Sequence, residues 1–215
     1  MNGKTHQLVG MTGSLLVSAA LLNFNVCTIY ECAAIVGMGA IGSYIPDIDH
    51  TGSVVGKKVS ILSYPIRWTS YLFRWLHKKT DVKLFKKISE MFAHRGIFHA
   101  PILWAIGFLL AFLLIPPLVT DAIIVGFVKA GIIGLFTGIF LHIGADMLNP
   151  TGVPILMPII NKKISIGKIV TGSRGEFLFK AIMLFGFLFA AGILFLVCLN
   201  TNTFNLQEIF REALS

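Results

Sequence analysis

Charged residues are scarce in this sequence: they make up 13 % of its 215 residues, against about 25 % in a typical water-soluble domain. This shortage excludes an ordinary soluble enzyme. Cysteine is also rare. Cys27, Cys32 and Cys198 lie in apolar stretches and form no CxxC pair, so they indicate neither a disulfide framework nor a zinc knuckle. Hydrophobic residues instead make up 55 %, and the mean hydropathy is +0.81, as in a membrane protein.

Five apolar stretches are long enough to cross a bilayer, which takes about 20 helical residues. We expect spans at residues 7–23, 27–46, 102–119, 121–147 and 177–199. The predicted fold class is an all-α, polytopic membrane protein with about five transmembrane helices. We expect one membrane-embedded domain over residues 1–200 and a short polar tail over 201–215. Val17-Ser18-Ala19 is a weak signal-peptide cleavage match and leaves cleavage after the first span open as an alternative.

Basic residues outnumber acidic ones, 18 to 10, and they gather in two segments. Residues 51–98 hold ten of them, residues 148–175 hold four, and Lys4 precedes the first span. Five spans place the N-terminus and both segments on one side of the membrane. Because lysine and arginine in short loops mark the cytoplasmic side, we expect this side to be cytoplasmic.

The polar segment 51–98 is predicted to form one or two amphipathic helices. Pro65 can begin one helix, whose Trp68 and Trp75 share a face, and Asp81 can cap a second one. Aromatic residues on one side and lysines on the other are typical of helices that lie in the headgroup layer. We expect this segment to contact anionic lipid headgroups, either as an anchor or as a lid beside a site.

Five of the six histidines lie in four short clusters, and each cluster adjoins the end of a predicted span. The clusters are Thr5-His6, Pro46-Asp47-Ile48-Asp49-His50, His94-Arg95-Gly96-Ile97-Phe98-His99 and His142-Ile143-Gly144-Ala145-Asp146. By span counting, all four lie at the same face of the membrane, so they can converge although they are distant in sequence. His77 stands apart and is expected to be a solvated surface residue.

Imidazole and carboxylate together favour a divalent metal such as Zn²⁺, Mn²⁺ or Fe²⁺. His142 and Asp146 are four residues apart, so on a helix they share a face and one metal can take both. Gly134 and Gly138 continue this row and allow a neighbouring helix to come close. Taken singly, each cluster is also compatible with an interfacial residue, a turn or an interhelical hydrogen bond, but their common depth favours a metal site.

The four motifs together resemble the YdjM-like family of bacterial and archaeal membrane proteins. The resemblance covers roughly residues 1–160, in order, and rests on Thr5-His6 with Gly10, the run from Gly42 to His50, the HRGIFH run at 94–99, and His142-x-x-x-Asp146 followed by Pro150-Thr151-Gly152. Members of that family are regarded as metal-dependent hydrolases. The family is thought to be distantly similar to zinc-dependent phospholipase C and P1-type nucleases, which are all-α phosphoesterases with zinc held by His and Asp.

The resemblance implies phosphoester hydrolysis at a metal site, and the clusters supply eight candidate ligands. These are His6, Asp47, Asp49, His50, His94, His99, His142 and Asp146. Asp47 is the favoured bridging carboxylate or base, and Arg95 is expected to steady a phosphate through its planar guanidinium. We expect two metal ions, preferably zinc. The related enzymes complete a three-zinc site with an N-terminal tryptophan, whereas this chain begins with Met1-Asn2-Gly3.

The leading hypothesis is a phosphoesterase of the cell membrane that acts on a lipid or lipid-linked phosphate at the cytoplasmic face, where the site opens at headgroup depth. The alternative is a metal-binding membrane protein without turnover, in transport or regulation. Transport is disfavoured because a transporter needs polar groups near the bilayer midplane, whereas here they gather at one face. Nucleic acid is not expected as a partner, since no DNA-binding motif appears.

This topology predicts the outcome of cysteine labelling in a variant whose three native cysteines are replaced. Lys57→Cys and Lys162→Cys should react with an impermeant thiol reagent only from the cytoplasm, and Asn205→Cys only from outside, because the basic segments follow the positive-inside rule. The measurement compares intact cells with opened membranes. Labelling of Lys57→Cys in intact cells would overturn the five-span arrangement.

Overall fold

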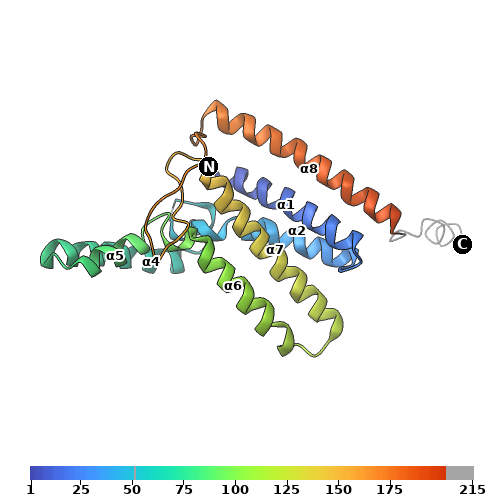
Figure 1. The fold of residues 1–215 in the computed structure, drawn as a ribbon, viewed down its shortest axis with the longest axis horizontal. Helices are drawn as coiled ribbons and strands as arrows, with labels where there is room; N and C mark the ends of the chain where they lie inside the picture. Colours follow the sequence, from blue (N-terminus) through green and yellow to red (C-terminus); the bar gives the residue numbers. More distant parts are fainter. Residues whose placement is uncertain (51, 202–215) are drawn as a thin grey trace, which may run out of the picture.

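The computed structural model describes residues 1–50 and 52–201, and this part of the chain is built from helices (Figure 1). It contains eight α-helices and three short 3-10 helices, and one isolated β-bridge joins Val153 to Ile164. The predicted all-α class is therefore confirmed. The elements are α1 (Gly3–Asn23), α2 (Ile29–Gly42), η1 (Ile45–Asp49), α3 (Val54–Lys58), α4 (Ser60–Thr80), α5 (Lys83–Met91), η2 (Ile97–His99), α6 (Pro101–Leu114), η3 (Pro116–Leu118), α7 (Ala122–Met147) and α8 (Arg174–Asn200).

Five helical segments are long and apolar enough to cross a membrane, as predicted. They are Gly3–Asn23, Ile29–Asp49, Pro101–Leu118, Ala122–Met147 and Arg174–Asn200. Side-chain caps lie at the start of four of these segments, and α1 and α2 are two examples. The Asn2 side chain accepts a hydrogen bond from the backbone of Lys4, and Thr28 and Glu31 form a reciprocal capping box. Such caps satisfy N–H groups that a helix start leaves without partners.

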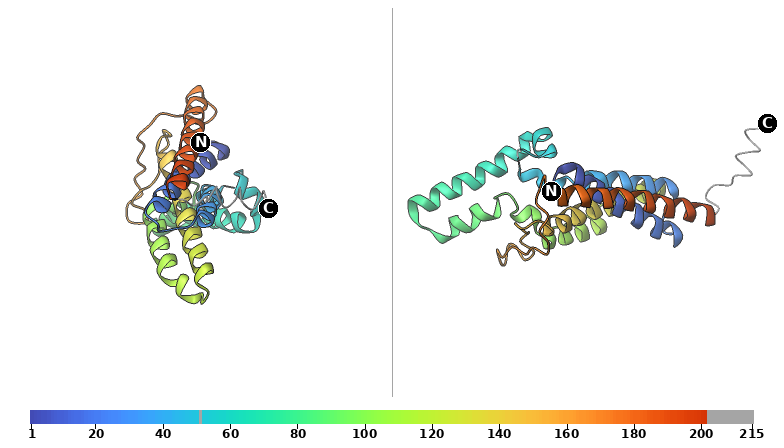
Figure 2. Two further views of the ribbon diagram at one scale, coloured as in Figure 1. Left: turned by 90° about the vertical axis from the view of Figure 1, so that its right-hand side faces the viewer. Right: turned by 90° about the horizontal axis from the view of Figure 1, so that it is seen from above.

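The helix α7 lies at the centre of the bundle and contacts α1, α2 and α6. On the other side of the bundle, α8 packs along α1 (Figures 1 and 2). Most large apolar residues of α6 and α8 are exposed, as expected for helices that face lipid. The described residues of the predicted domain 1–200 thus form one connected bundle, while residues 202–215 of the predicted tail lie outside the described part. The boundary at residue 200 therefore stays a prediction.

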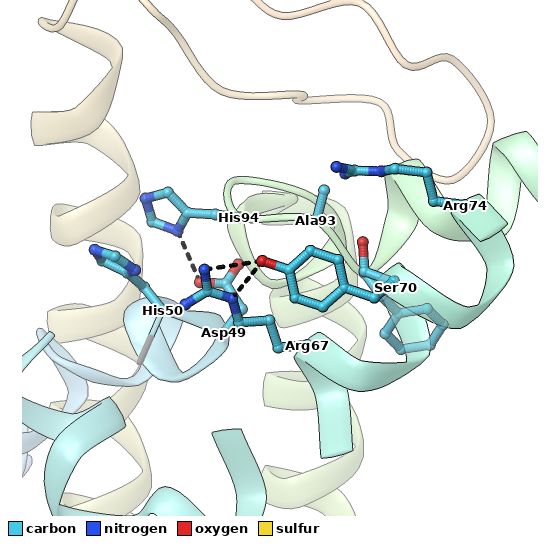
Figure 3. A pocket seen from close by; sticks show the side chains of 9 residues that line it. Asp49, His50, Arg67, Ser70, Arg74, Ala93 and His94 are labelled. Carbon is cyan, nitrogen blue, oxygen red and sulfur yellow. Dashed lines mark hydrogen bonds and ion pairs between the residues drawn. The ribbon is translucent and has the colours of Figure 1, made fainter. Parts of the chain in front are cut away.

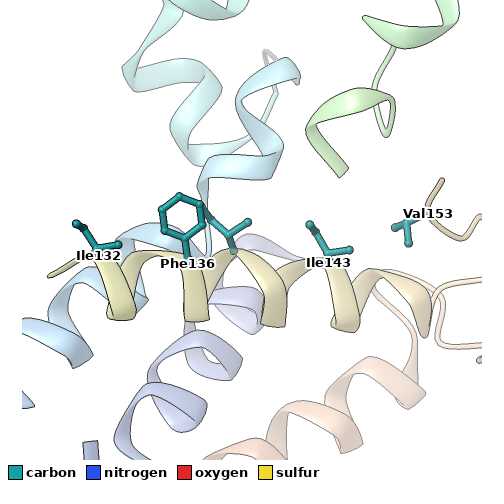
Figure 4. Packing of buried hydrophobic residues seen from close by; sticks show 5 residues of the cluster. Ile132, Phe136, Ile143 and Val153 are labelled. Carbon is teal, nitrogen blue, oxygen red and sulfur yellow. The ribbon is translucent and has the colours of Figure 1, made fainter. Parts of the chain in front are cut away.

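One face of α7 forms the largest apolar core cluster. Ile132, Phe136 and Ile143 follow one another along this helix, and Val153 lies just beyond its end (Figure 4). From α6, the rings of Trp104 and Phe108 pack edge-on against Phe136. This contact holds one face of α6 against α7, while most of the other large apolar residues of α6 are exposed.

Helix α2 packs closely against both α1 and α7, and glycines of α1 and α7 lie at the points of contact. A Cβ added at Gly134 or Gly138 of α7 would collide with the backbone carbonyl oxygen of Ile35 or Gly39 in α2. On the other side, Gly10 of α1 leaves only 2.8 Å between an added Cβ and the Gly39 carbonyl oxygen. The expected close approach along the Gly134–Gly138 row is thus confirmed, and the neighbour is α2.

The segment 51–98 contains the two predicted amphipathic helices, but their limits differ from the prediction. Helix α4 begins at Ser60, so the prediction that Pro65 begins it is wrong: Pro65 lies past the first turn and cannot donate a backbone hydrogen bond to the carbonyl of Ile61. Asp81 ends α4 in the left-handed conformation with φ of 53°, which aspartate tolerates better than most residues. Helix α5 then begins at Lys83 without a side-chain cap.

Helices α4 and α5 form a hairpin that projects from the end of the bundle near the N-terminus (Figures 1 and 2). The rings of Phe73 and Phe85 lie 5.7 Å apart between them, and Ser70 Oγ donates to the carbonyl of Ser89 at 2.9 Å. The aromatic face of α4 stays exposed, with Trp68 and Trp75 more than half accessible. Contact of this face with lipid headgroups stays a prediction.

Helix packing at α2 predicts a large difference between two glycine substitutions in α7. Gly138→Ala should destabilise the protein by about 1–3 kcal/mol, because overpacking against a backbone carbonyl cannot relax through a rotamer change. Gly144→Ala should be neutral or slightly stabilising, since nothing lies within 4 Å of its added Cβ. Unfolding midpoints in detergent measure both, and equal midpoints would contradict the close packing of α2 on α7.

Candidate metal centre

The four His/Asp clusters converge at one end of the bundle, as predicted. His6 lies in the first turn of α1, Asp47 and Asp49 lie on η1 after α2, His99 lies on η2 before α6, and Asp146 lies in the last turn of α7. Their side chains meet because each of these segments reaches the same end of the bundle. His6, His99, Asp49 and Asp146 are buried, each with at most 2 % of its surface exposed.

The carboxylate of Asp146 is the point where three separate segments meet. Its Oδ1 lies 3.4 Å from His6 Nε2 and accepts a 2.7 Å hydrogen bond from Arg95 Nη2. The other oxygen, Oδ2, lies 3.3 Å from His99 Nε2. The amino group of Met1 also lies 3.3 Å from Oδ1. A buried carboxylate of this kind requires several cationic or donor groups around it.

Four of the predicted ligands form the first of two groups with metal-binding geometry. Asp47, His99, His142 and Asp146 each offer one ligand atom, and these atoms lie within 4.8 Å of one another. His142 Nε2 lies 3.7 Å from both Asp47 Oδ1 and Asp146 Oδ2, and His99 Nε2 lies 3.5 Å from Asp47 Oδ1. Two imidazoles and two carboxylates are a donor set typical of zinc, manganese or iron.

The second group joins Asp47 to Asp49 and His94, again within 4.8 Å. His94 Nδ1 lies 2.9 Å from Asp49 Oδ1, and the backbone N–H of Arg95 donates to Asp49 Oδ2 at 3.2 Å. Arg95 has a positive φ of 59°, in the left-handed region that few non-glycine residues adopt. Asp47 belongs to both groups, as a bridging carboxylate would.

The structure places the other two candidate ligands beside these groups. The His6 ring stacks on the His142 ring at 3.8 Å between centroids, and His6 also contacts Asp146. The His50 ring lies beside the His94 ring of the second group, tilted by 34° and with its centroid 4.6 Å away. Neither belongs to a group whose ligand atoms all lie within 4.8 Å among the described residues.

Several buried imidazole nitrogens lack hydrogen-bond partners, which fits a metal site. In the described part of the chain they are His6 Nδ1, both ring nitrogens of His99, and His142 Nε2. Buried polar atoms almost always have a partner, so four orphaned nitrogens in one cluster need an explanation. His142 Nδ1 lies 2.6 Å from the carbonyl oxygen of Ser43. With the proton on Nδ1, this bond leaves Nε2 as a free ligand atom oriented by its partner.

Burial and nearby charges at the cluster shift the pKa values of two groups outside the spans, His99 and Lys163. Burial alone would lower the pKa of His99, but the nearby carboxylates of Asp146 and Asp47, 3.3 and 3.5 Å from its Nε2, outweigh it and raise the pKa to about 9. Burial, and after it the charge of Arg95, lowers the pKa of Lys163. The carboxylates of Asp47 and Asp146 thus favour the protonated form of His99.

Several supporting residues were not predicted from the sequence. Thr151 accepts a hydrogen bond from Arg95 Nη1, and Glu176 accepts from the backbone of Asn2 at 2.5 Å and from Thr5 Oγ1 at 3.1 Å. Glu176 therefore attaches the start of α8 to the turn that carries His6. Its only sequence signal was an acidic residue directly before the predicted span 177–199. The predicted phosphate contact of Arg95 stays a prediction, since its guanidinium pairs with Asp146 here.

The bundle and its buried cluster define a multi-pass α-helical membrane protein with a His/Asp group that can bind metal. Comparison with known families makes this more specific. The family described as YdjM inner membrane protein matches residues 1–207, so the chain belongs to that family and to the cell membrane. The expected resemblance is confirmed.

Individual relatives agree with this assignment. The chain is 27 % identical to the protein YvsG of Bacillus subtilis (strain 168) over 158 residues, which cover 74 % of each protein. It is 33 % identical to the inner membrane protein YdjM of Escherichia coli (strain K12) over 117 residues, which cover 53 % of this chain and 44 % of that protein. YdjM of Shigella flexneri shows the same values. No solved structure matches.

The cluster predicts a specific loss of metal. Purified wild type should carry at least one transition metal, and His142→Ala or Asp146→Ala should lose most of it while the protein stays in the membrane. Each change removes a ligand of the first group. His77→Ala, on the exposed hairpin, should keep the metal. Elemental analysis of the detergent-purified proteins measures this, and a wild type that takes up neither zinc nor manganese would refute the site.

Proposed function

We propose that this protein is a metal-dependent phosphoesterase that acts on a lipid or lipid-linked phosphate at the cytoplasmic face of the membrane. The observation that carries the proposal is the pair of adjacent ligand groups that share Asp47. Two metal sites joined by one carboxylate are typical of phosphoester hydrolysis. When bound, such a metal pair polarises the phosphoryl oxygens and lowers the pKa of a water molecule.

Asp47 has the position required of a catalytic carboxylate. Its side chain is 17 % exposed, whereas Asp49 and Asp146 are closed off at 0 % and 2 %. Asp47 can therefore reach both the ligand groups and a substrate. Pro46 at the start of η1 restricts the backbone just before it. The carboxylate can accept a proton from the attacking water and hold its orientation.

Arg95 and the histidines support this role for the site. The guanidinium of Arg95 is 12 % exposed and is held between Asp146 and Thr151. A substrate phosphate can take over one edge of this planar fork while the other edge keeps its partner. His99 and His142 are fully buried and fix the inner wall of the site. They exclude water from that side, so the reacting groups meet in a defined orientation.

The position of the site supports a lipid substrate and a site on the cytoplasmic side. The cluster lies at one end of the helices that are long enough to span a membrane, and a bilayer around these helices would bring phosphate headgroups to that end. The basic hairpin α4–α5 leaves the bundle at the same end. Its many lysine and arginine residues favour a position on the cytoplasmic side of the membrane and contact with anionic lipid headgroups. A metal-binding protein without turnover would share all of these features except a need for Asp47 as a base.

The substitution Asp47→Asn distinguishes a phosphoesterase from a metal-binding protein without turnover. The change keeps the side-chain shape and one ligand oxygen but removes the charge, so the variant should retain some metal. Its rate of phosphoester hydrolysis should fall by at least about 100-fold, the low end of general acid–base catalysis. Assays on phospholipids, isoprenoid phosphates and a generic phosphodiester, each with zinc or manganese, measure the rate.

Lys78→Ala is the matched control, because Lys78 is exposed on the hairpin. It should hydrolyse the substrate at the wild-type rate. Equal rates for wild type and Asp47→Asn would show that Asp47 has another role. If metal-loaded wild type hydrolyses none of these substrates, the phosphoesterase proposal fails.

A further inference from the structure

A cavity of about 240 Å³ lies between the metal cluster and α4 (Figure 3). One wall belongs to the cluster and consists of Asp49, His50 and His94. The opposite wall comes from α4 and carries Arg67 and Arg74. The cavity is several times the roughly 30 Å³ that one water molecule occupies in the liquid. It therefore has room for a ligand group beside the candidate metal site.

The cationic wall is ordered by a tyrosine. Arg67 donates from Nε and Nη2 to the hydroxyl of Tyr71 at 3.3 and 3.0 Å. The Cζ atoms of Arg67 and Arg74 lie 5.6 and 5.9 Å from the centre of the Tyr71 ring. The spacing 67, 71, 74 places all three residues on one face of α4. Because the ring restrains both guanidinium groups, less conformational entropy is lost when they bind a ligand.

The two walls are fixed relative to each other. Helix α4 packs against η1, the element that carries Asp47 and Asp49, as well as against α5. Asp49 lines the cavity and also belongs to the second ligand group. The cavity is thus continuous with that group. In Figure 3 the guanidinium of Arg67 points toward Asp49, and Arg74 extends above Ala93.

The charge on the α4 wall suits an anion. Within the described ranges 1–50 and 52–201, Arg74 forms no ion pair with a carboxylate. Asp49, the acidic residue of the cavity, is already bound by His94 and by the Arg95 backbone. Arginine forks match the oxygens of a phosphate, and each charge-assisted pair is stronger than a neutral hydrogen bond.

We propose that this cavity binds a second phosphate, adjacent to the one held at the metal cluster, so that the substrate is a diphosphate. The inference rests on the proposed function and narrows its substrate class from any phosphoester to esters with two linked phosphates. It gives the hairpin a direct role: α4 supplies the cationic half of the substrate site. The diphosphate can belong to a lipid headgroup or to a free molecule, and the chemistry of recognition is the same.

Binding of a non-hydrolysable diphosphate tests the subsite without turnover. Methylenediphosphonate should bind the metal-loaded, full-length protein, and Arg67→Gln or Arg74→Gln should weaken that binding at least about tenfold, as expected for a lost charge-assisted hydrogen bond. Inorganic phosphate, which needs only the metal cluster, should bind wild type and variants within about twofold. Isothermal titration calorimetry measures all of these affinities. Lys78→Gln, on α4 but outside the cavity, is the matched control.

Two further variants separate recognition from folding. Arg67→Lys keeps the charge but not the fork and should fall between wild type and Arg67→Gln. Tyr71→Phe keeps the ring and removes the hydroxyl that positions Arg67, so its loss should be smaller than that of Arg67→Gln. Metal content and detergent unfolding midpoints, equal to wild type, verify that each variant is folded. If Arg67→Gln or Arg74→Gln loses metal, Arg67→Lys or Arg74→Lys takes its place in the comparison.

Activity assays then identify the source of the diphosphate. A polyprenyl diphosphate in micelles and soluble pyrophosphate are each compared with a polyprenyl monophosphate. Arg67→Gln and Arg74→Gln should lower kcat/KM for the preferred diphosphate at least about tenfold and leave the monophosphate within about twofold. Equal losses for mono- and diphosphate, or equal affinity of wild type and variants for methylenediphosphonate, would overturn the inference but leave the phosphoesterase proposal standing. If wild type is inactive on every substrate yet shows the predicted binding differences, the hydrolase proposal fails and the diphosphate subsite remains.

Discussion

The buried carboxylate of Asp146 is the interaction on which the arrangement depends. One side chain at the end of α7 contacts His6 from α1, Arg95 and His99 from the segment before α6, and it lies one helical turn from His142. A charge with 2 % exposure is tolerated only when groups from its surroundings compensate it. The start of α1, the HRGIFH turn and the end of α7 are therefore held to one point. A metal ion bound there would take over part of this compensation.

Close helix packing brings the remaining ligands to that point. Gly134 and Gly138 remove the side chains that would separate α2 from α7, and Gly10 does the same between α1 and α2. The end of α2 then reaches the end of α7, where the Ser43 carbonyl accepts from His142 and η1 presents Asp47 and Asp49. In a membrane, where no hydrophobic effect drives helices together, such small residues permit the van der Waals contact that holds them.

The helical bundle and the hairpin α4–α5 form the two halves of the molecule, and each contributes different side chains near the candidate site. The bundle supplies a dry, rigid wall of imidazoles and carboxylates, and the hairpin α4–α5 supplies arginines ordered by Tyr71. The chain passes between the halves through η1 and α3 and again through residues 92–99, and Asn161 Nδ2 donates to Glu90 Oε2 of α5 at 2.9 Å. A ligand in the cavity between η1 and α4 would contact both halves.

Much of this could be predicted from the sequence because the signals are local. Apolar stretches of helical length predicted the five spans, and the i, i+4 spacing of His142 and Asp146 placed both on one face. The convergence of four clusters followed from counting spans, since every second helix end lies on the same side. These features depend on the bilayer thickness and on helix geometry. Both can be evaluated from the spacing of residues along one segment of the sequence.

The tertiary structure decided which of those residues touch and what surrounds them. Asp47 belongs to both ligand groups while His50 lies outside them, although the two are only three residues apart, because η1 turns their side chains in different directions. The roles of Glu176, Thr151, Arg67 and Arg74 could not be predicted, since each depends on a partner far away in the chain. Sequence spacing predicts contacts within one helix, whereas contacts between helices depend on packing of the whole bundle.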